Sequence, residues 1–208
     1  MVNQLKSKLF TNFYLISLLF MYSCAVEKKE LSHDFPTSLI AFESYIDGKS
    51  KIFTMKPDGS GIIQLTKNDY NNHWPRWSPD GEKIIFVSDQ DGNQEIYLMN
   101  RDGSKQRRIT NHPADDYCPI WSPDGSMIAF CTRRYNKGGS EIVRRNINAG
   151  ETWGINLTRL TYSQDHHSAK ADDFLSWSPD GNWIAFESDR DRDDPEIYLI
   201  NAVDGSNA

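Results

Sequence analysis

The densest group of chemically capable side chains lies in one polar stretch late in the sequence. Asp165, His166 and His167 are consecutive, and Asp172 and Asp173 follow shortly afterwards. Imidazole nitrogens and carboxylate oxygens are common ligands of divalent metals, so this group could hold one. Adjacent histidines on a strand, however, point to opposite faces, and nothing else in the sequence assembles a third ligand. We therefore expect a solvated loop and assign no metal-binding residue.

Patterns typical of other active sites are absent. The sequence has no G-x-S-x-G, H-E-x-x-H, G-x-x-x-x-G-K or C-x-x-C pattern. The acidic stretches 89–93 and 189–194 superficially resemble calcium loops, but neither has a Glu at the twelfth position of an EF-hand loop. Both are explained as hairpin turns. We therefore assign no catalytic or cofactor-binding residue.

The start of the sequence has the features of an export signal. Lys6 and Lys8 precede a mostly apolar run of 13 residues, from Leu9 to Met21. A membrane-spanning helix needs roughly 20 apolar residues, so this run is too short to span. A short cationic stretch followed by a short apolar one predicts a signal peptide over residues 1–23.

Cys24 is the expected site of lipid attachment. The stretch Met21-Tyr22-Ser23-Cys24 resembles the lipobox of bacterial lipoproteins, in which the cysteine is lipidated and becomes the new N-terminus. Residues 24–38 are polar and lack periodicity, which predicts a tether between the lipid and a folded domain. The alternative is an ordinary secreted protein in which Cys24 merely lies near the cleavage site.

The two remaining cysteines, Cys118 and Cys131, leave two interpretations open. Thiols of an exported protein can form a disulfide. Cysteines also serve as small buried apolar residues, and we favour this interpretation slightly.

Composition limits the class of protein. The chain has 208 residues, of which 38% are hydrophobic and 25% charged, so a globular domain is expected. A disordered tail, a collagen-like rod and a multi-span membrane protein are excluded. Aromatic residues reach 12%, and the glycines and prolines leave little room for long helices, which favours an all-β fold. The net charge of −6, without a basic run, argues against nucleic-acid binding.

A repeat dominates the chain. The pentapeptide Trp-Ser-Pro-Asp-Gly occurs at 77–81, 121–125 and 177–181. Ser-Pro-Asp-Gly favours a tight turn, because proline presets φ and glycine tolerates the exit conformation. Each copy is followed by an apolar run, a second run such as Glu-Ile-Tyr-Leu, a turn and a weaker segment that ends in threonine. Four short strands per repeat of roughly 40 to 45 residues are typical of a propeller blade.

The repeats do not complete a ring. We predict blade one at 39–77, blade two at 83–121, blade three at 127–177 and two strands of blade four at 183–201. About three and a half blades fall short of the usual four to eight. Either the sequence is a piece of a longer propeller, which we favour, or two chains complete one ring.

These repeats resemble the WD-type repeats of the TolB-like β-propeller family. The resemblance rests on the elements WSPDG, IAFxSD, EIYLxN, DGS and RRIT and covers residues 39–208. It implies a propeller of four-stranded blades, usually with more blades than this sequence contains. It also implies export to the periplasm and binding of partner proteins in the cell envelope.

We therefore expect an exported, lipid-anchored β-propeller that acts as a non-catalytic protein-binding scaffold. It would lie on the periplasmic side of the outer membrane, or be secreted if Cys24 carries no lipid. Its working surface would be one end of the ring or the central funnel, where loops gather. Oligogalacturonate lyases, which resemble this repeat family, use metal-binding histidines on a propeller. The alternative is therefore a metal-dependent carbohydrate lyase or hydrolase that uses His166 and His167.

Overall fold

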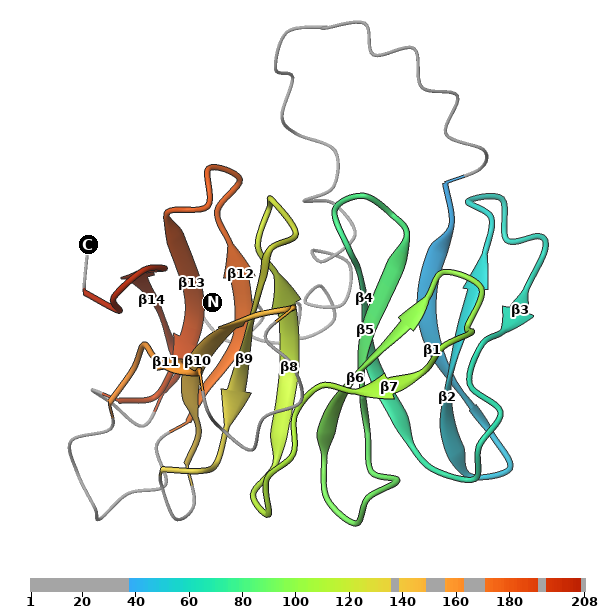
Figure 1. Cartoon of the computed structure of the whole chain (residues 1–208), viewed down its shortest axis with the longest axis horizontal. Helices are drawn as coiled ribbons and strands as arrows, with labels where there is room; N and C mark the ends of the chain where they lie inside the picture. Colours follow the sequence, from blue (N-terminus) through green and yellow to red (C-terminus); the bar gives the residue numbers. More distant parts are fainter. Residues whose placement is uncertain (1–37, 136–138, 149–155, 163–170, 191–193, 207–208) are drawn as a thin grey trace, which may run out of the picture. The chain divides into compact units, whose positions relative to one another are not determined.

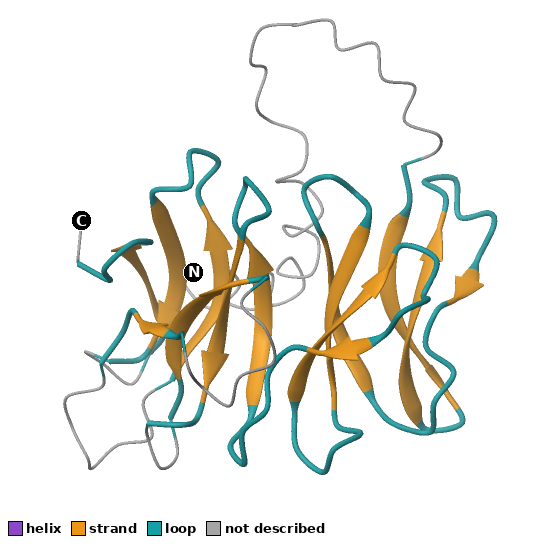
Figure 2. Ribbon diagram, in the orientation of Figure 1, coloured by secondary structure: helices purple, strands orange, loops and turns teal. Residues whose placement is uncertain are grey.

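The computed structural model describes residues 38–135, 139–148, 156–162, 171–190 and 194–206 (Figure 1). Every regular element in these ranges is a β-strand, as Figure 2 shows, which confirms the predicted all-β class. No helix in the described ranges is long and apolar enough to cross a membrane. The predicted signal peptide, Cys24 and nearly all of the predicted tether lie outside the described residues.

The described strands form four antiparallel sheets in chain order. The first sheet contains β1 (Ile40–Ile46), β2 (Lys49–Met55) and β3 (Ile63–Gln64). The second contains β4 (Asn72–Trp77), β5 (Lys83–Ser88), β6 (Glu95–Asn100) and β7 (Arg107–Arg108). The third contains β8 (Asp116–Trp121), β9 (Met127–Thr132), β10 (Glu141–Asn146) and β11 (Thr158–Arg159). The fourth contains β12 (Asp172–Trp177), β13 (Trp183–Ser188) and β14 (Glu196–Asn201).

The apolar runs of the middle sheets are buried on both faces, as predicted. All four side chains of residues 84–87 in β5 are at most 1% exposed, and those of 128–131 in β9 are fully buried. A strand that is covered from both sides needs no alternation of apolar and polar residues. Phe86, Phe130 and Phe186 occupy the same repeat position and are all buried, so each sheet after the first contributes one such ring to the core.

The predicted blade boundaries are wrong by one strand. We expected the tryptophan-bearing strand to close a blade, but β4 pairs with β5, β8 with β9 and β12 with β13. The reason lies in the Ser-Pro-Asp-Gly turn, in which Ser78 N donates to Lys83 O and Gly81 N to Ser78 O. A turn this tight makes a hairpin, so the strands on either side of it must be neighbours in one sheet. The longer loop before β4 makes the connection between sheets.

The sheets converge at their first strands. Strand β4 contacts β1 and β2, β8 contacts β4, β5 and β6, and β12 contacts β8, β9 and β10. Among the described elements, β3, β7 and β11 contact only the neighbouring strand of their own sheet. The sheets therefore fan outward from β4, β8 and β12, which we call the inner strands (Figure 1).

The repeated tryptophans lie at the seams between sheets, as predicted. Trp121 Nε1 donates to the carbonyl oxygen of Arg76 in the preceding inner strand at 3.2 Å. Trp77 packs against the apolar cluster that contains Ile52 and Leu65 of the first sheet. Because an indole ring is large and has one polar group, it can fill a seam and bond across it.

Candidate binding surface on the inner strands

Each inner strand contains a bulge at the same repeat position. The pairing register shifts between His73 and Arg76, between Tyr117 and Ile120, and between Asp173 and Ser176. The first bulged residue of each strand has a positive φ: 50° at Trp74, 48° at Cys118 and 53° at Phe174. We call these three residues the bulge row. Residues other than glycine pay roughly 1–2 kcal/mol for this left-handed conformation, and bulges often re-aim side chains at functional sites.

The first member of the bulge row is fixed by the preceding sheet. The backbone N–H of Trp74 donates to Glu43 Oε2 at 2.9 Å, and His73 Nδ1 lies 3.5 Å from the same oxygen. The hydrogen bond with His73 lowers the pKa of Glu43, and the Trp74 N–H adds to this effect. The Trp74 ring lies 5.9 Å from the Tyr117 ring, so the indole is held between two sheets.

The other members of the bulge row are accessible to different degrees. The Phe174 residue is 68% exposed although it is large and apolar. Cys118 is half-buried, Cys131 of the adjacent strand is buried, and both are free cysteines. The structure thus holds no disulfide between them. Trp74, at the same repeat position, packs on Tyr117 of the following sheet, whereas no described sheet follows that of Phe174. The Phe174 ring can therefore contact a further protein surface.

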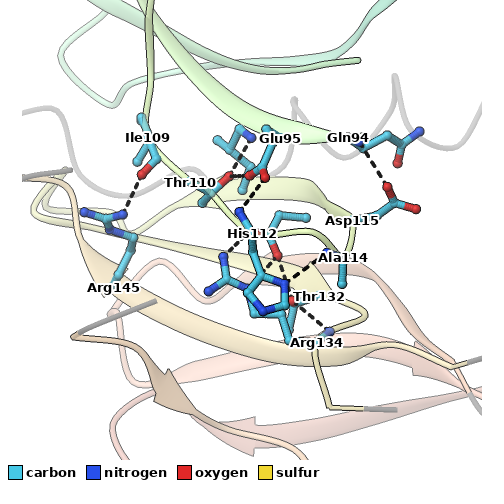
Figure 3. A network of polar contacts seen from close by, with 12 residues as sticks. Gln94, Glu95, Ile109, Thr110, His112, Ala114, Asp115, Thr132, Arg134 and Arg145 are labelled. Carbon is cyan, nitrogen blue, oxygen red and sulfur yellow. Dashed lines mark hydrogen bonds and ion pairs between the residues drawn. The ribbon is translucent and has the colours of Figure 1, made fainter. Parts of the chain in front are cut away.

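A polar network lies at the strand ends next to the bulge row (Figure 3). The buried Glu95 accepts hydrogen bonds from Thr110 Oγ1 and from the backbone N–H of His112, each at 2.6 Å. Thr110 Oγ1 in turn accepts the N–H of Ile96 at 2.8 Å. Burial raises the pKa of Glu95, and burial lowers the pKa of His112.

Ion pairs extend this network into the neighbouring sheets. Arg134 pairs with the fully buried Asp116, which also accepts the hydroxyl of Thr132 at 2.7 Å. Arg190 pairs with Asp172 at 2.8 Å at the same repeat position of the fourth sheet. Buried charges that are paired and hydrogen-bonded in this way hold strand ends together.

The predicted metal group is only partly described. Asp165, His166 and His167 lie outside the described residues. The Asp172 carboxylate forms an ion pair with Arg190, and Asp173 accepts a hydrogen bond from the Ser140 hydroxyl at 3.3 Å. Within the described ranges, no three His, Cys, Asp or Glu side chains are grouped to hold a metal ion. A metal site at His166 and His167 stays a prediction from the sequence.

The aspartates of the repeated pentapeptide serve the turn. Ser78, Ser122 and Ser178 each donate to the aspartate two residues later, at 2.5 Å. A backbone N–H beyond the turn donates to the same carboxylate oxygen. In the acidic stretches, Asp89 accepts the N–H of Asn71, and Asp189 accepts that of Ala171. These contacts fit the predicted structural roles.

A cleft of about 730 Å³ lies at the seam between the second and third sheets. Its lining includes Trp121, Leu98 and Ile147 together with the cations Lys83, Lys105 and Arg107. Neither this cleft nor the bulge row was predicted. A signal for the bulges existed, because Pro75 and Pro119 lie inside strands, where proline is confined to edges and bulges.

Comparison with protein families matches residues 30–175 to the TolB beta propeller domain. A putative TolB from Agrobacterium tumefaciens superposes with a TM-score of 0.66 at 30% identity, covering 81% of this chain and 59% of that chain. TolB from Acinetobacter baumannii superposes with a TM-score of 0.63 at 22% identity, covering 80% of this chain and 38% of that one. The second similarity concerns the fold alone. Together these matches confirm a β-propeller with an incomplete ring of blades in the described residues.

Two further sequences share shorter stretches with this chain. Dipeptidyl-peptidase 5 of Porphyromonas gingivalis is 36% identical over 84 residues, which are 38% of this chain and 12% of the peptidase. An uncharacterized protein of Agrobacterium fabrum is 37% identical over 49 residues, which are 24% of this chain and 17% of that protein. This chain therefore spans a small part of the length of either relative.

Proposed function

The chain belongs to the TolB β-propeller domain family, and from this premise we propose that it is a non-catalytic protein-binding scaffold of the bacterial cell envelope. The observation that carries the proposal is the bulge row. Three inner strands present Trp74, Cys118 and Phe174 at one repeat position, and Phe174 is 68% exposed. Large aromatic side chains on a rigid support are typical centres of protein–protein interfaces.

The contacts of the polar groups in the described residues favour a scaffold function rather than a catalytic one. Asp116 is paired with Arg134, and Glu95 accepts hydrogen bonds from Thr110 and His112. A general acid or base must reach a substrate proton, whereas these carboxylates are directed at protein donors. These contacts give the two carboxylates a structural role, which is to hold the ends of the strands together.

Photo-crosslinking tests the proposal. A photoreactive phenylalanine analogue at position 174 should form adducts with a defined envelope protein in intact cells. The matched control is the same analogue at Asp102, an exposed position in the turn between β6 and β7. We expect a discrete adduct from position 174 and none from position 102. Equal adducts from both positions, or none from position 174, would refute a binding role for the bulge row.

Anchoring by lipid on Cys24 is part of the same proposal. The support comes from the sequence, in which a short cationic and apolar leader precedes Ser23-Cys24. We expect the protein to fractionate with outer membranes and the variant Cys24→Ser to appear in the soluble periplasmic fraction. Unchanged fractionation of the variant would refute lipid attachment at Cys24. The scaffold role would then be tested by crosslinking alone.

A further inference from the structure

The two cysteines of the third sheet lie together across two adjacent strands. Cys131 of β9 pairs in register with Tyr117, the residue just before the bulge at Cys118 in β8. The bulge lies directly beside this pair, and Cys118 packs against the apolar cluster that contains Cys131. Neighbouring strands are ~4.8 Å apart, and disulfides join residues across such distances.

The surroundings of the two sulfur atoms differ. Cys118 is half-buried, whereas Cys131 is fully buried. The hydrogen bond from Cys131 is the largest of the effects that lower the pKa of Cys118, and burial raises that of Cys131. The backbone N–H of Phe174 and the charge of Arg76 also lower the pKa of Cys118, while burial and Asp173 raise it. Cys118 is therefore the thiol that an external reagent meets first and in its more reactive form.

The repeat provides an internal control for this arrangement. At the position of Cys118 the other inner strands have Trp74 and Phe174. At the position of Cys131 the second and fourth sheets have Val87 and Glu187. The fold thus accepts aromatic, aliphatic and acidic side chains at these positions. Folding of a blade therefore does not require cysteine at either of these positions.

We propose that Cys118 and Cys131 form a reversible dithiol–disulfide site that is oxidised by external disulfides. The Cys118 thiolate attacks one sulfur of the external disulfide, forms a mixed disulfide and releases one thiolate. Cys131 then loses its proton and attacks the Cys118 sulfur, which closes the internal disulfide and releases the second thiolate. The external disulfide is reduced to two thiols while the two cysteines are oxidised. This proposal is tested by thiol chemistry and the scaffold function by crosslinking at Phe174, so either can fail without the other.

The test uses the full chain carrying Cys24→Ser, which leaves only the two cysteines of interest. The reduced, folded protein is incubated with oxidised glutathione, quenched with acid, denatured and labelled with a maleimide polymer. We expect both thiols to disappear together, with loss of two hydrogen atoms in the intact mass and no covalent dimer. Addition of a dithiol reductant should restore both labels.

Single substitutions test the order of the steps. Cys131→Ser should accumulate one glutathione adduct on Cys118, because no second thiol can displace it. Cys118→Ser should react at least about tenfold more slowly, since its remaining thiol is buried. Circular dichroism and the urea midpoint check that both variants are folded. The proposal is overturned if the parent keeps two free thiols, if it forms only intermolecular disulfides, or if the two variants react at equal rates.

Discussion

The aspartates of the repeated turn illustrate how single residues act in this fold. Asp124 accepts the hydroxyl of Ser122 and both the N–H and the hydroxyl of Ser126. The hydrogen bond from Ser122 is the largest contribution that lowers the pKa of Asp124 to about 2. The charged carboxylate therefore stabilises the turn, and its protonated form does so less well.

A pH dependence of stability follows for Asp124. Because the folded-state pKa is lowered, its contribution is complete above the ordinary aspartate pKa of about 3.9 and is lost as the pH falls towards 2. We expect the difference in unfolding free energy between the parent and Asp124→Asn to shrink over that range. Urea denaturation at several pH values measures it, and the comparison cancels the titration of all other carboxyl groups. A difference that stays constant with pH would contradict the assignment.

The bulge row gives a second prediction for single residues. Phe174 has a φ of 53°, which suits glycine better than any residue with a Cβ. We expect Phe174→Gly to be more stable than Phe174→Ala by roughly 0.5–1 kcal/mol in urea denaturation. At the exposed Ser176 of the same strand, where φ is not positive, the order should reverse. The same order at both positions would show that the left-handed backbone is not the cause.

At the scale of elements, buried ion pairs hold the strand ends. The Arg134 side chain is 5% exposed and its partner Asp116 is fully buried, whereas Arg101 and Glu82 are 38% and 62% exposed. We expect Arg134→Met to cost about 3–5 kcal/mol, because Asp116 keeps an unpaired buried charge. Arg101→Met should cost less than ~1 kcal/mol. Urea denaturation of the two variants decides, and similar costs would mean that Arg134 is not a structural partner.

The sequence predicted the strongest elements closely and the weakest ones less well. The predicted run Glu-Ile-Tyr-Leu lies in β6, whereas the predicted weaker segment RRIT, which ends in threonine, is reduced to Arg107–Arg108. The ladder ends early because Ile109 N and Thr110 N both donate to Ile96 O, while the Thr110 hydroxyl accepts Ile96 N. The Thr110 hydroxyl thus takes the place of a backbone carbonyl as the acceptor for Ile96 N. The pattern of apolar residues in the sequence does not indicate such a replacement.

The bulge row escaped prediction for a related physical reason. In a bulge, two residues of one strand lie opposite a single residue of its partner. The residues that follow the bulge therefore change faces, although the amino-acid composition of the strand is unchanged. The prolines at 75 and 119 pointed to irregular strands, but the fourth sheet has the same bulge at Phe174-Leu175 without proline. The position of the bulge row depends on how β12 and the equivalent inner strands pack against the preceding sheet. The sequence pattern of a single strand does not give that packing.

At the scale of the whole molecule, stability comes from stacking each sheet on the next. The fourth sheet has no following sheet in the described residues, and its outer face shows the difference. Ile197 is 73% exposed and Leu199 48%, while their repeat counterparts Ile96 and Leu98 are 0% and 5% exposed. The same side chains in the same strand positions are therefore buried only where a neighbouring sheet covers them.

This comparison makes a quantitative prediction about stacking. Ile96→Ala should cost about 2–5 kcal/mol of unfolding free energy, because it leaves a cavity between two sheets. Ile197→Ala removes the same atoms from the equivalent strand, and should cost less than ~1 kcal/mol because water already reaches them. Urea denaturation of both variants measures the difference, which isolates the contribution of one seam. Equal costs would mean that the Ile197 face is covered in solution, and hydrogen exchange of β14 would then show protection matching that of β6.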